Sequence, residues 1–212
     1  MVAAVAALNE FYGLPLSSAQ ALSLMGRIEA QASGSIHYDN IAPSFLGGLQ
    51  LCSANTVQTY ALAWPEDWRL IMAYPDIDIP TEHARHILPS DYSSKTVIQQ
   101  TQCVAQFIHA LHTDDLELAK VSIQDYLAEP NRQTLLPNFH SHKKHILASY
   151  AAVSVGISGS GPTIFVITDQ ASDVVNIKNY LYQNYVLNLN GDDSQKGFVV
   201  EAEICKEGVS VL

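Results

Sequence analysis

Four polar residues that could hold a cation together with a small polar substrate fall between residues 29 and 40: Glu29, His37, Asp39 and Asn40. Glu29 offers the hard carboxylate oxygen that Mg²⁺ prefers, usually shared with substrate phosphates. Asp39 can accept a hydrogen bond from a nucleophilic hydroxyl, and Asn40 can bind polar substrate atoms. Asx residues are also common in turns, so a polar turn in which Asp39 and Asn40 cap the backbone explains the same spacing about equally well.

The helix before this cluster is expected to turn Glu29 toward the protein interior. Ser17 or Ser18 predicts the start of a helix to about residue 32, with an apolar stripe at Ala21, Leu22, Met25, Ile28 and Ala32. Glu29 falls within that stripe, and an inward-facing carboxylate needs a cation, a metal or a hydrogen-bond donor. This placement favours a functional role for the cluster over a simple turn.

A second candidate is the glycine- and serine-rich segment that precedes the apolar run at residues 163–167. Small residues allow the backbone to approach a ligand or another loop closely. The segment lacks the Lys-Ser/Thr ending of a Walker A loop and enters a strand instead of a helix. A tight connection between strands explains it nearly as well. Its candidate residues are Gly156, Ser158, Gly159, Ser160 and Gly161.

Two arginines are the candidate anion-binding cations. Arg85 follows Thr81 by one helical turn, and Arg132 follows Glu129-Pro130-Asn131. Arginine binds carboxylates and phosphates through two parallel hydrogen bonds. Taken singly, a surface salt bridge is the more common role of an arginine, and Thr81 after a proline is also typical of an ordinary helix N-cap.

The histidine-rich segment 139–145 is interpreted as an exposed helical face and not as a metal site. On a helix, His142 and His145 share a face whereas His140 points elsewhere. The neighbouring Lys143 and Lys144 disfavour a bound cation.

Composition excludes several classes of partner. The formal net charge of −10 argues against a nucleic-acid or anionic-membrane surface, because both need clustered cations. No apolar run approaches the roughly 20 residues needed to span a bilayer. Cys52, Cys103 and Cys205 are odd in number and widely spaced, which indicates free thiols and favours the cytoplasm.

The pattern of apolar residues predicts an α+β fold in two parts, with a boundary at Pro65-Glu66-Asp67 dividing residues 1–65 from 66–212. Strands are expected at 49–53, 56–64, 69–74, 163–167 and 198–204. In the last of these, Val200, Ala202 and Ile204 should face inward, opposite Glu201 and Glu203. Helices are expected at 2–12, 17–32, 81–87, 93–112, 114–127, 138–150 and 171–186.

The chain resembles the homoserine kinases of the GHMP small-molecule kinase superfamily over essentially its whole length. Five segments carry the resemblance in order: 34–43, 45–48, 81–89, 128–132 and 156–163. Any one of them is modest evidence, and all five in order are highly specific. The resemblance implies a phosphotransferase that uses ATP and Mg²⁺ to phosphorylate the side-chain hydroxyl of L-homoserine, on the path to threonine. It also implies an S5-like N-terminal domain and a ferredoxin-like C-terminal domain.

The resemblance assigns roles residue by residue. Glu29 matches the magnesium ligand, and Asp39 the group that orients the substrate hydroxyl. Asn40 and His37 would line the amino-acid pocket, and Arg85 and Arg132 would clamp the substrate carboxylate, with Thr81 beside the reacting centre. Residues 156–163 match the third superfamily motif, which packs against the phosphate loop.

The sequence departs from the family in one respect. Family members carry a glycine- and serine-rich phosphate loop just before the helix that here is expected at residues 2–12. We therefore expect an N-terminally truncated chain with little or no kinase activity alone. Two alternatives are a non-catalytic module that binds amino acids, and a protein that forms a homodimer through a sheet edge exposed by the truncation.

Overall fold

The computed structural model describes residues 1–53, 56–187 and 197–210, and it confirms the α+β class. Its contacts divide the chain into two compact units, Met1–Trp64 with Ile204–Leu212, and Pro65–Glu203. Residues 204–210 therefore differ from the prediction, which grouped them with the second part. The reason is local pairing, because the N–H of Gly48 donates to the carbonyl of Cys205 at 2.7 Å and that of Val209 to Phe45 at 3.2 Å.

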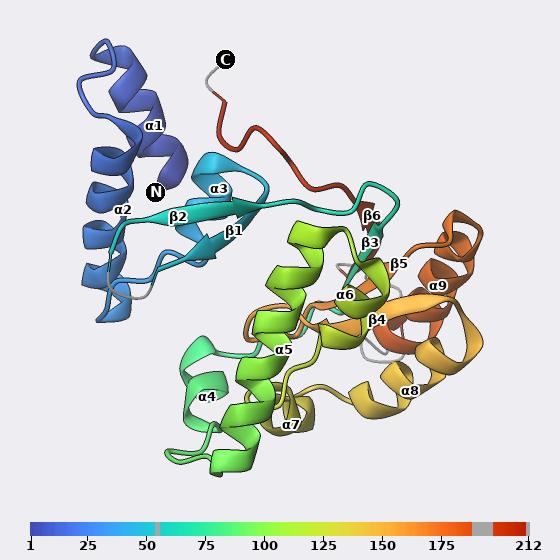
Figure 1. The fold of residues 1–212 in the computed structure, drawn as a ribbon. Helices are drawn as coiled ribbons and strands as arrows, with labels where there is room; N and C mark the ends of the chain where they lie inside the picture. Colours follow the sequence, from blue (N-terminus) through green and yellow to red (C-terminus); the bar gives the residue numbers. More distant parts are fainter. Residues whose placement is uncertain (54–55, 188–196, 211–212) are drawn as a thin grey trace. The chain divides into compact units, whose positions relative to one another are not determined.

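The first unit consists of three helices and a hairpin: α1 (Val2–Phe11), α2 (Ser18–Ser33), α3 (Ile41–Leu46), β1 (Leu49–Cys52) and β2 (Thr59–Leu62) (Figure 1). A capping box starts α2, because the Ser17 side chain accepts from the Gln20 N–H and the Gln20 side chain accepts from the Ser17 N–H. Gly34 ends the helix in the left-handed conformation at φ +81°.

The core of the first unit confirms most of the predicted stripe on α2. Ala21, Leu22 and Met25 are buried and pack with residues of α1 and α3. Ile28 was predicted to join them but is 38% exposed, because the helix turns this position away from the packed face. The side chain of Ala32 lies outside the described residues.

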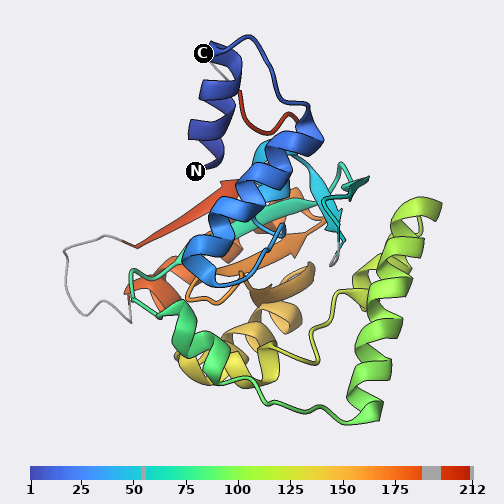
Figure 2. The same cartoon turned by 90° about the vertical axis from the view of Figure 1, so that its left-hand side faces the viewer.

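The second unit is a four-stranded antiparallel sheet with helices (Figures 1 and 2). The strand order is β4 (Ala152–Ile157), β5 (Ile164–Thr168), β3 (Arg69–Tyr74) and β6 (Phe198–Ala202). The helices are α4 (Thr81–His86), α5 (Ser94–Thr113), α6 (Leu116–Ser122), α7 (Glu129–Arg132), α8 (Phe139–Ser149) and α9 (Val174–Leu181), the last continued by a π-helical turn, Tyr182–Val186.

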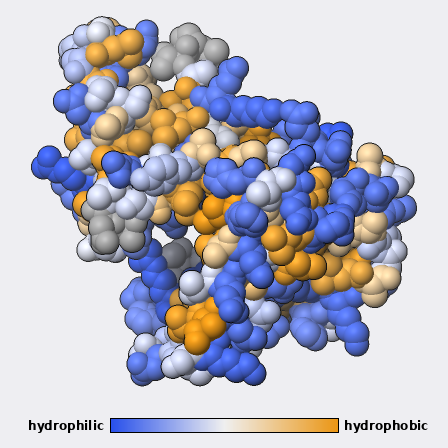
Figure 3. Space-filling model, in the orientation of Figure 1, coloured by the Kyte–Doolittle hydropathy of each residue, from blue (hydrophilic) through white to orange (hydrophobic). Residues whose placement is uncertain are grey.

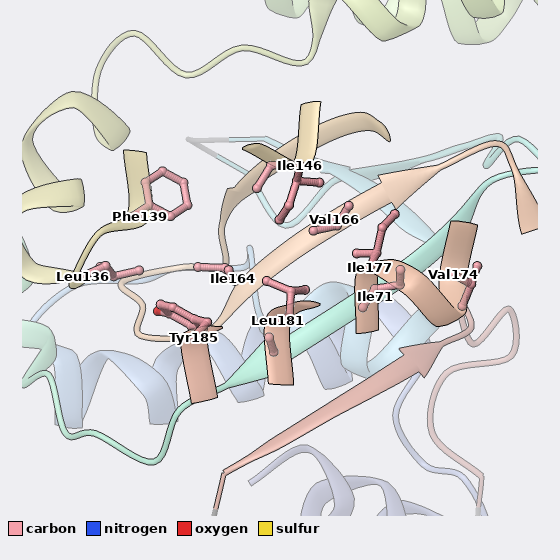
Figure 4. Close-up of a cluster of buried hydrophobic side chains, with 12 residues drawn as sticks. Ile71, Leu136, Phe139, Ile146, Ile164, Val166, Val174, Ile177, Leu181 and Tyr185 are labelled. Carbon is pink, nitrogen blue, oxygen red and sulfur yellow. The ribbon is translucent and has the colours of Figure 1, made fainter. Parts of the chain in front are cut away.

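Side chains of α8 and α9 pack against one face of this sheet and form its core (Figure 4). Ile71, Ile164 and Val166 point toward Phe139, Ile146, Ile177, Leu181 and Tyr185, and Val155 belongs to the same core cluster. On the edge strand β6, Val199 packs on this core while Val200 is 41% exposed, so the predicted inward face of that strand is wrong by one residue.

The cysteine prediction is confirmed, because Cys52, Cys103 and Cys205 are free. Within the described ranges, none of the helices has both the length and the hydrophobicity required to cross a membrane.

Candidate active site

The first unit contains a cavity of about 360 Å³ that brings the first predicted cluster together. All four predicted residues, Glu29, His37, Asp39 and Asn40, line it, although they come from α2 and from the segment before α3. The first turn of α1 lines the same cavity. The remaining lining residues are Met1, Val2, Ala3, Ile41 and Ser44.

The carboxylate of Glu29 reaches this cavity because α2 presents it at the margin of its packed face. Met25, one turn earlier, is fully buried, whereas Glu29 is half-buried. A carboxylate in this position can remain hydrated on one side while it faces the cavity on the other. The sequence predicted that Glu29 faces the interior, and in the structure its side chain is only half-buried.

The segment from residue 37 to residue 40 is held by its own backbone and by α2. The ring of Tyr38 lies directly over Gly26, where an added Cβ would approach its atoms to 2.7 Å. The carbonyl of Tyr38 accepts from the N–H of Ala42, which starts α3. Asn40 precedes α3, but its carboxamide makes no capping hydrogen bond, so the capping role that the turn interpretation gave it is absent. The close contact of Tyr38 with Gly26 therefore determines how near the segment that carries Asp39 lies to α2.

The electrostatics of the cavity combine two carboxylates with the positive end of a helix dipole. The first N–H groups of an α-helix have no partner within the helix, and no side chain caps α1. Burial, together with the nearby Asp39 carboxylate, raises the pKa of the Cys52 thiol. His37 shares a hydrogen bond with Ser35, with 2.7 Å between Nε2 and Oγ.

These donors suit a magnesium ion that is shared with phosphate. Mg²⁺ is commonly held by one or two carboxylates with waters and substrate phosphates completing its shell. Glu29 and Asp39 supply two carboxylates, and the α1 N-terminus supplies free backbone N–H groups for phosphate oxygens. The described residues contain no group of three or more His, Cys, Asp or Glu side chains that could hold a metal by themselves, so the phosphate would have to complete the site.

In the second unit, Arg132 connects three of the predicted segments. Its Nε donates to the carbonyl of Ala84 in α4 at 3.2 Å, and its Nη1 donates to the carbonyl of Gly159 at 2.8 Å. Since a guanidinium has five N–H donors, the remaining three are not used by these two bonds. Arg132 is therefore both a scaffold residue and a candidate anion ligand.

The side chains of Thr81 and Arg85 are exposed on α4, one turn apart. Pro80 is the N-cap of this helix, so Thr81 is its first helical residue and not its cap. Ala84, which accepts from Arg132, directly precedes Arg85. This hydrogen bond joins α7 to α4, so the backbone of Arg85 lies close to the side chain of Arg132.

The glycine- and serine-rich segment is the connection between the antiparallel strands β4 and β5. The N–H of Ser158 donates to the carbonyl of Thr163 at 2.8 Å, and that of Gly161 to Ser158 at 3.0 Å. Gly159 and Gly161 have positive φ, which favours glycine. Gly156 belongs to β4, where the ring of Phe165 lies against it. The predicted strand connection is thus observed, and a ligand-binding role of this loop remains a prediction.

The histidine-rich segment forms α8, where His142 and His145 share a face as predicted, but the prediction of an exposed face is wrong for His142, which packs on Tyr180. His142 is buried and shares a hydrogen bond with Tyr180, with 3.0 Å between Nδ1 and the hydroxyl oxygen, and the ring of His145 stacks on the same tyrosine. Lys143 forms an ion pair with Glu129 at 2.5 Å. Burial lowers the pKa of His142. These contacts give the segment a structural role.

Sequence reasoning missed two supports of the site. Asp125 accepts from the N–H groups of Leu127, Ala128 and Glu129 at 2.8, 2.7 and 3.0 Å, and so turns the chain into α7, which carries Arg132. An Asp three or four residues before a short helix is a recognisable capping pattern. The contact between Gly26 and Tyr38 has no comparable local pattern, because it depends on how the chain folds back on α2.

Comparison with known proteins finds matches to two family models of the GHMP kinases. Residues 1–48 match the family described as "GHMP kinases N terminal domain", and residues 144–187 match "GHMP kinases C terminal". The predicted resemblance is thereby confirmed at the level of this superfamily.

Solved structures show the same fold. Homoserine kinase from Cytophaga hutchinsonii ATCC 33406 is 28% identical with a TM-score of 0.85, covering 98% of this chain and 64% of its own. A putative homoserine kinase from Listeria monocytogenes is 20% identical with a TM-score of 0.67, covering 98% and 65%. Mevalonate kinase from L. major, in complex with R-mevalonate, is 16% identical with a TM-score of 0.63, covering 94% and 62%. The chain therefore spans less than two thirds of each of these structures.

Proposed function

We propose that the chain forms the acceptor-binding part of a homoserine kinase, because two of its segments match the N- and C-terminal domain models of the GHMP kinases. The reaction would transfer a phosphoryl group from ATP to the side-chain hydroxyl of L-homoserine. The observation that carries the proposal is the cavity that gathers Glu29, His37, Asp39 and Asn40 around the first turn of α1. The homoserine kinase that is 28% identical to this chain supports the choice of acceptor.

In this proposal Asp39 accepts a hydrogen bond from the hydroxyl of L-homoserine. The bond orients the hydroxyl so that a lone pair of the hydroxyl oxygen points at the phosphorus atom that is transferred. Phosphoryl transfer depends mainly on positioning and charge neutralisation, so Asp39 need not be a strong base. Asn40 and His37 bind polar atoms of the amino acid at the same cavity wall. Tyr38, seated on Gly26, keeps both neighbours in place.

The second unit would bind the acceptor carboxylate. Arg85 is exposed and adjoins Ala84, to which Arg132 is bonded, and in this proposal both guanidinium groups bind the same carboxylate. Thr81, one turn before Arg85, would stand beside the reacting centre, and the loop from Gly156 to Gly161 would pack against the family's phosphate loop. Arg132 holds the loop from Gly156 to Gly161 through Gly159.

ATP and Mg²⁺ are the implied cosubstrate and cofactor. Bound Mg²⁺ would neutralise phosphate charge, with Glu29 as its protein ligand and the N–H groups of the first turn of α1 directed at phosphate oxygens. The glycine- and serine-rich phosphate loop of the family is not among these 212 residues. We therefore propose that the chain needs that loop for rapid transfer.

A coupled ADP-release assay tests this function. The 212-residue chain and a chain extended upstream to include the loop are compared with Mg-ATP and L-homoserine, using D-homoserine and R-mevalonate as controls. We expect rapid turnover only in the extended chain and only with L-homoserine. Asp39→Asn should lower kcat about 100-fold with little change in KM, because it keeps the shape but weakens the hydrogen bond to the hydroxyl. Turnover of mevalonate instead would identify a different acceptor.

A second candidate is a non-catalytic module that binds an amino acid, favoured by the two hydrogen bonds that hold Arg132 in place beside α4 and the loop before β5. Calorimetry with L-homoserine in the absence of nucleotide separates the two. Binding without turnover in the extended chain would support the module. Turnover in the extended chain supports the kinase.

A further inference from the structure

The second unit contains a cavity of about 270 Å³ between α5, the segment after α6, and the free edge of β4 (Figure 1). Residues 154–157 of β4 line the cavity in succession, and β4 pairs with β5 alone in the described sheet. Of the candidate residues of the active site, only Gly156 also lines this cavity. The cavity therefore stands apart from the proposed function.

The wall of the cavity is mainly apolar. Val104 and Phe107 come from α5, and Phe165 comes from β5. The ring of Phe165 lies against Gly156, where an added Cβ would approach it to 2.5 Å. Figure 3 shows hydrophobic surface in orange among blue where α5 and α6 face the viewer. An apolar wall with a few polar groups is typical of a small-molecule site.

The segment that closes the cavity after α6 is held in place by α5. The side chain of Gln100 donates to the carbonyl of Gln124 at 3.3 Å and accepts from the N–H of Tyr126 at 2.8 Å. These two hydrogen bonds fix both sides of the segment on the helix. The cavity is therefore formed before any ligand binds, as small-molecule sites usually are.

One end of the cavity carries a single pair of opposite charges. The side chains of Lys143 and Glu129 are only 20% and 16% exposed and form an ion pair at 2.5 Å. Lys143 uses one of its three donors on Oε1 of Glu129, and Oε2 of Glu129 accepts no hydrogen bond within the described residues. The nearby Asp125 carboxylate accepts from three backbone N–H groups, which offset its charge. One ammonium and one carboxylate therefore remain to face a ligand.

A buried hydroxyl in the same wall has no partner. Ser154 lines the cavity and is only 6% exposed, and its hydroxyl makes no hydrogen bond to any residue that the structure describes. Buried polar groups in folded proteins are nearly always hydrogen-bonded. A ligand in the cavity would supply the partner that the chain does not.

We propose that this cavity binds a free α-amino acid with an aliphatic side chain. The ammonium of Lys143 and the hydroxyl of Ser154 donate to the carboxylate of the ligand, and Glu129 accepts from its ammonium. The aliphatic side chain lies among Val104, Phe107 and Phe165. A simple carboxylate would meet Glu129, and a simple amine would meet Lys143, so each would face one like charge. The volume lies just below the range of about 300–1,000 Å³ for drug-sized ligands, which suits a single amino acid.

Calorimetric titration with L-leucine in the absence of nucleotide tests the proposal, using both the 212-residue chain and the upstream-extended chain. We expect a dissociation constant on the order of 100 μM, as for a ligand of this size. 4-Methylpentanoate lacks the ammonium and 3-methylbutylamine lacks the carboxylate, so each should bind at least about tenfold more weakly. No binding of L-leucine at 10 mM, or equal binding of all three compounds, would overturn the proposal.

Two variants of the wall test the position of the ligand. Ser154→Ala should weaken L-leucine binding about tenfold without lowering the melting temperature, because the hydroxyl has no partner to lose within the described chain. Val104→Trp should abolish binding by filling the cavity. Val97→Trp is its matched control, since Val97 is as exposed on the same helix and does not line the cavity. Unchanged binding in Ser154→Ala and Val104→Trp would contradict the proposed position.

Binding at the candidate active site must be told apart from binding in this cavity. Asp39→Asn and Arg85→Met should leave the affinity for L-leucine unchanged, because neither residue lines the cavity. Loss of L-leucine binding in these variants would place the ligand at the acceptor site and overturn the proposal. The titration needs no turnover, so its result is independent of whether the chain phosphorylates L-homoserine.

Discussion

Replacement of Arg132 by methionine should both loosen the second unit and weaken substrate binding. Arg132 donates to Ala84 in a half-buried bond and to Gly159 in an exposed one. A hydrogen bond to a charged group contributes roughly 1.5–3 kcal/mol. The lower end applies to the first bond and less than about 1 kcal/mol to the second, because solvent screens it. The sum is about 2 kcal/mol, which corresponds to a fall in melting temperature of about 4–8 °C.

Arg85→Met is the matched control for this change. Arg85 is exposed on α4, and within the described residues its guanidinium makes no hydrogen bond to α7 or to the loop before β5. Its replacement should leave the melting temperature within about 1 °C of the wild type. If both arginines hold the substrate carboxylate, each variant should raise the dissociation constant of L-homoserine about 10- to 100-fold.

The two variants are compared by differential scanning calorimetry and by calorimetric titration with L-homoserine. The reasoning predicts a large loss of stability for Arg132→Met alone and a similar loss of affinity for both. An unchanged melting temperature for Arg132→Met would refute the scaffold role. Unchanged affinity in both variants would refute the carboxylate clamp while leaving the scaffold role intact.

Three further changes test the supports of the fold and site. Gly26→Ala should cost about 1–3 kcal/mol and weaken L-homoserine binding, because the added Cβ displaces Tyr38; unchanged binding by calorimetry would contradict this. Tyr185→Phe removes a buried 2.6 Å hydrogen bond to the Pro162 carbonyl, so thermal denaturation should show a loss of about 1–2 kcal/mol. Burial lowers the pKa of His142, so as the pH falls the unfolded chain takes up a proton at this imidazole before the folded chain does. The free energy of unfolding should therefore fall as the pH drops below about 6.5. In His142→Gln the melting temperature should depend less on pH over this range.

The helices and strands that the sequence predicted well are those with a strong local pattern. The strand at Arg69–Tyr74 has its predicted bounds, and the predicted helix starts at Ser17 and Ser93 are both observed N-caps. A capping residue and a periodic pattern of apolar residues determine the structure of the few residues around them, so these elements can be predicted from the local sequence alone. The predicted helix 114–127 is shorter, ending at Ser122.

The elements that escaped prediction depend on distant contacts. The strand Ala152–Ile157 was not predicted, because it is covered on both sides and lacks alternation; it is defined by its pairing with β5. The helix Ile41–Leu46 is only six residues long and includes Pro43. The phase of β6 was also wrong, since its neighbour β3 and not its own pattern decides which side faces the core.

The candidate site shows the same division between local and distant causes. The types of residue in the site could be predicted from the sequence, because few side chains other than carboxylates, amides and arginines bind metals, hydroxyl groups or anions. Which of them meet was not evident: Arg132 bonds to a carbonyl 48 residues earlier and to another 27 residues later. A resemblance to a family can supply these pairings, whereas spacing along the chain cannot.

The cavity of the first unit places two carboxylates beside the positive end of a helix, in a chain with a formal net charge of −10. The dipole of α1 contributes only about half a positive charge at its N-terminus, which does not offset Glu29 and Asp39 together. A free phosphate group would therefore be repelled, whereas a phosphate that brings Mg²⁺ adds two positive charges to the same space. In the proposed function, Glu29 would bind the metal that a phosphate brings, and Asp39 would be left to the acceptor hydroxyl. This division would give each of the two carboxylates of the cavity its own role.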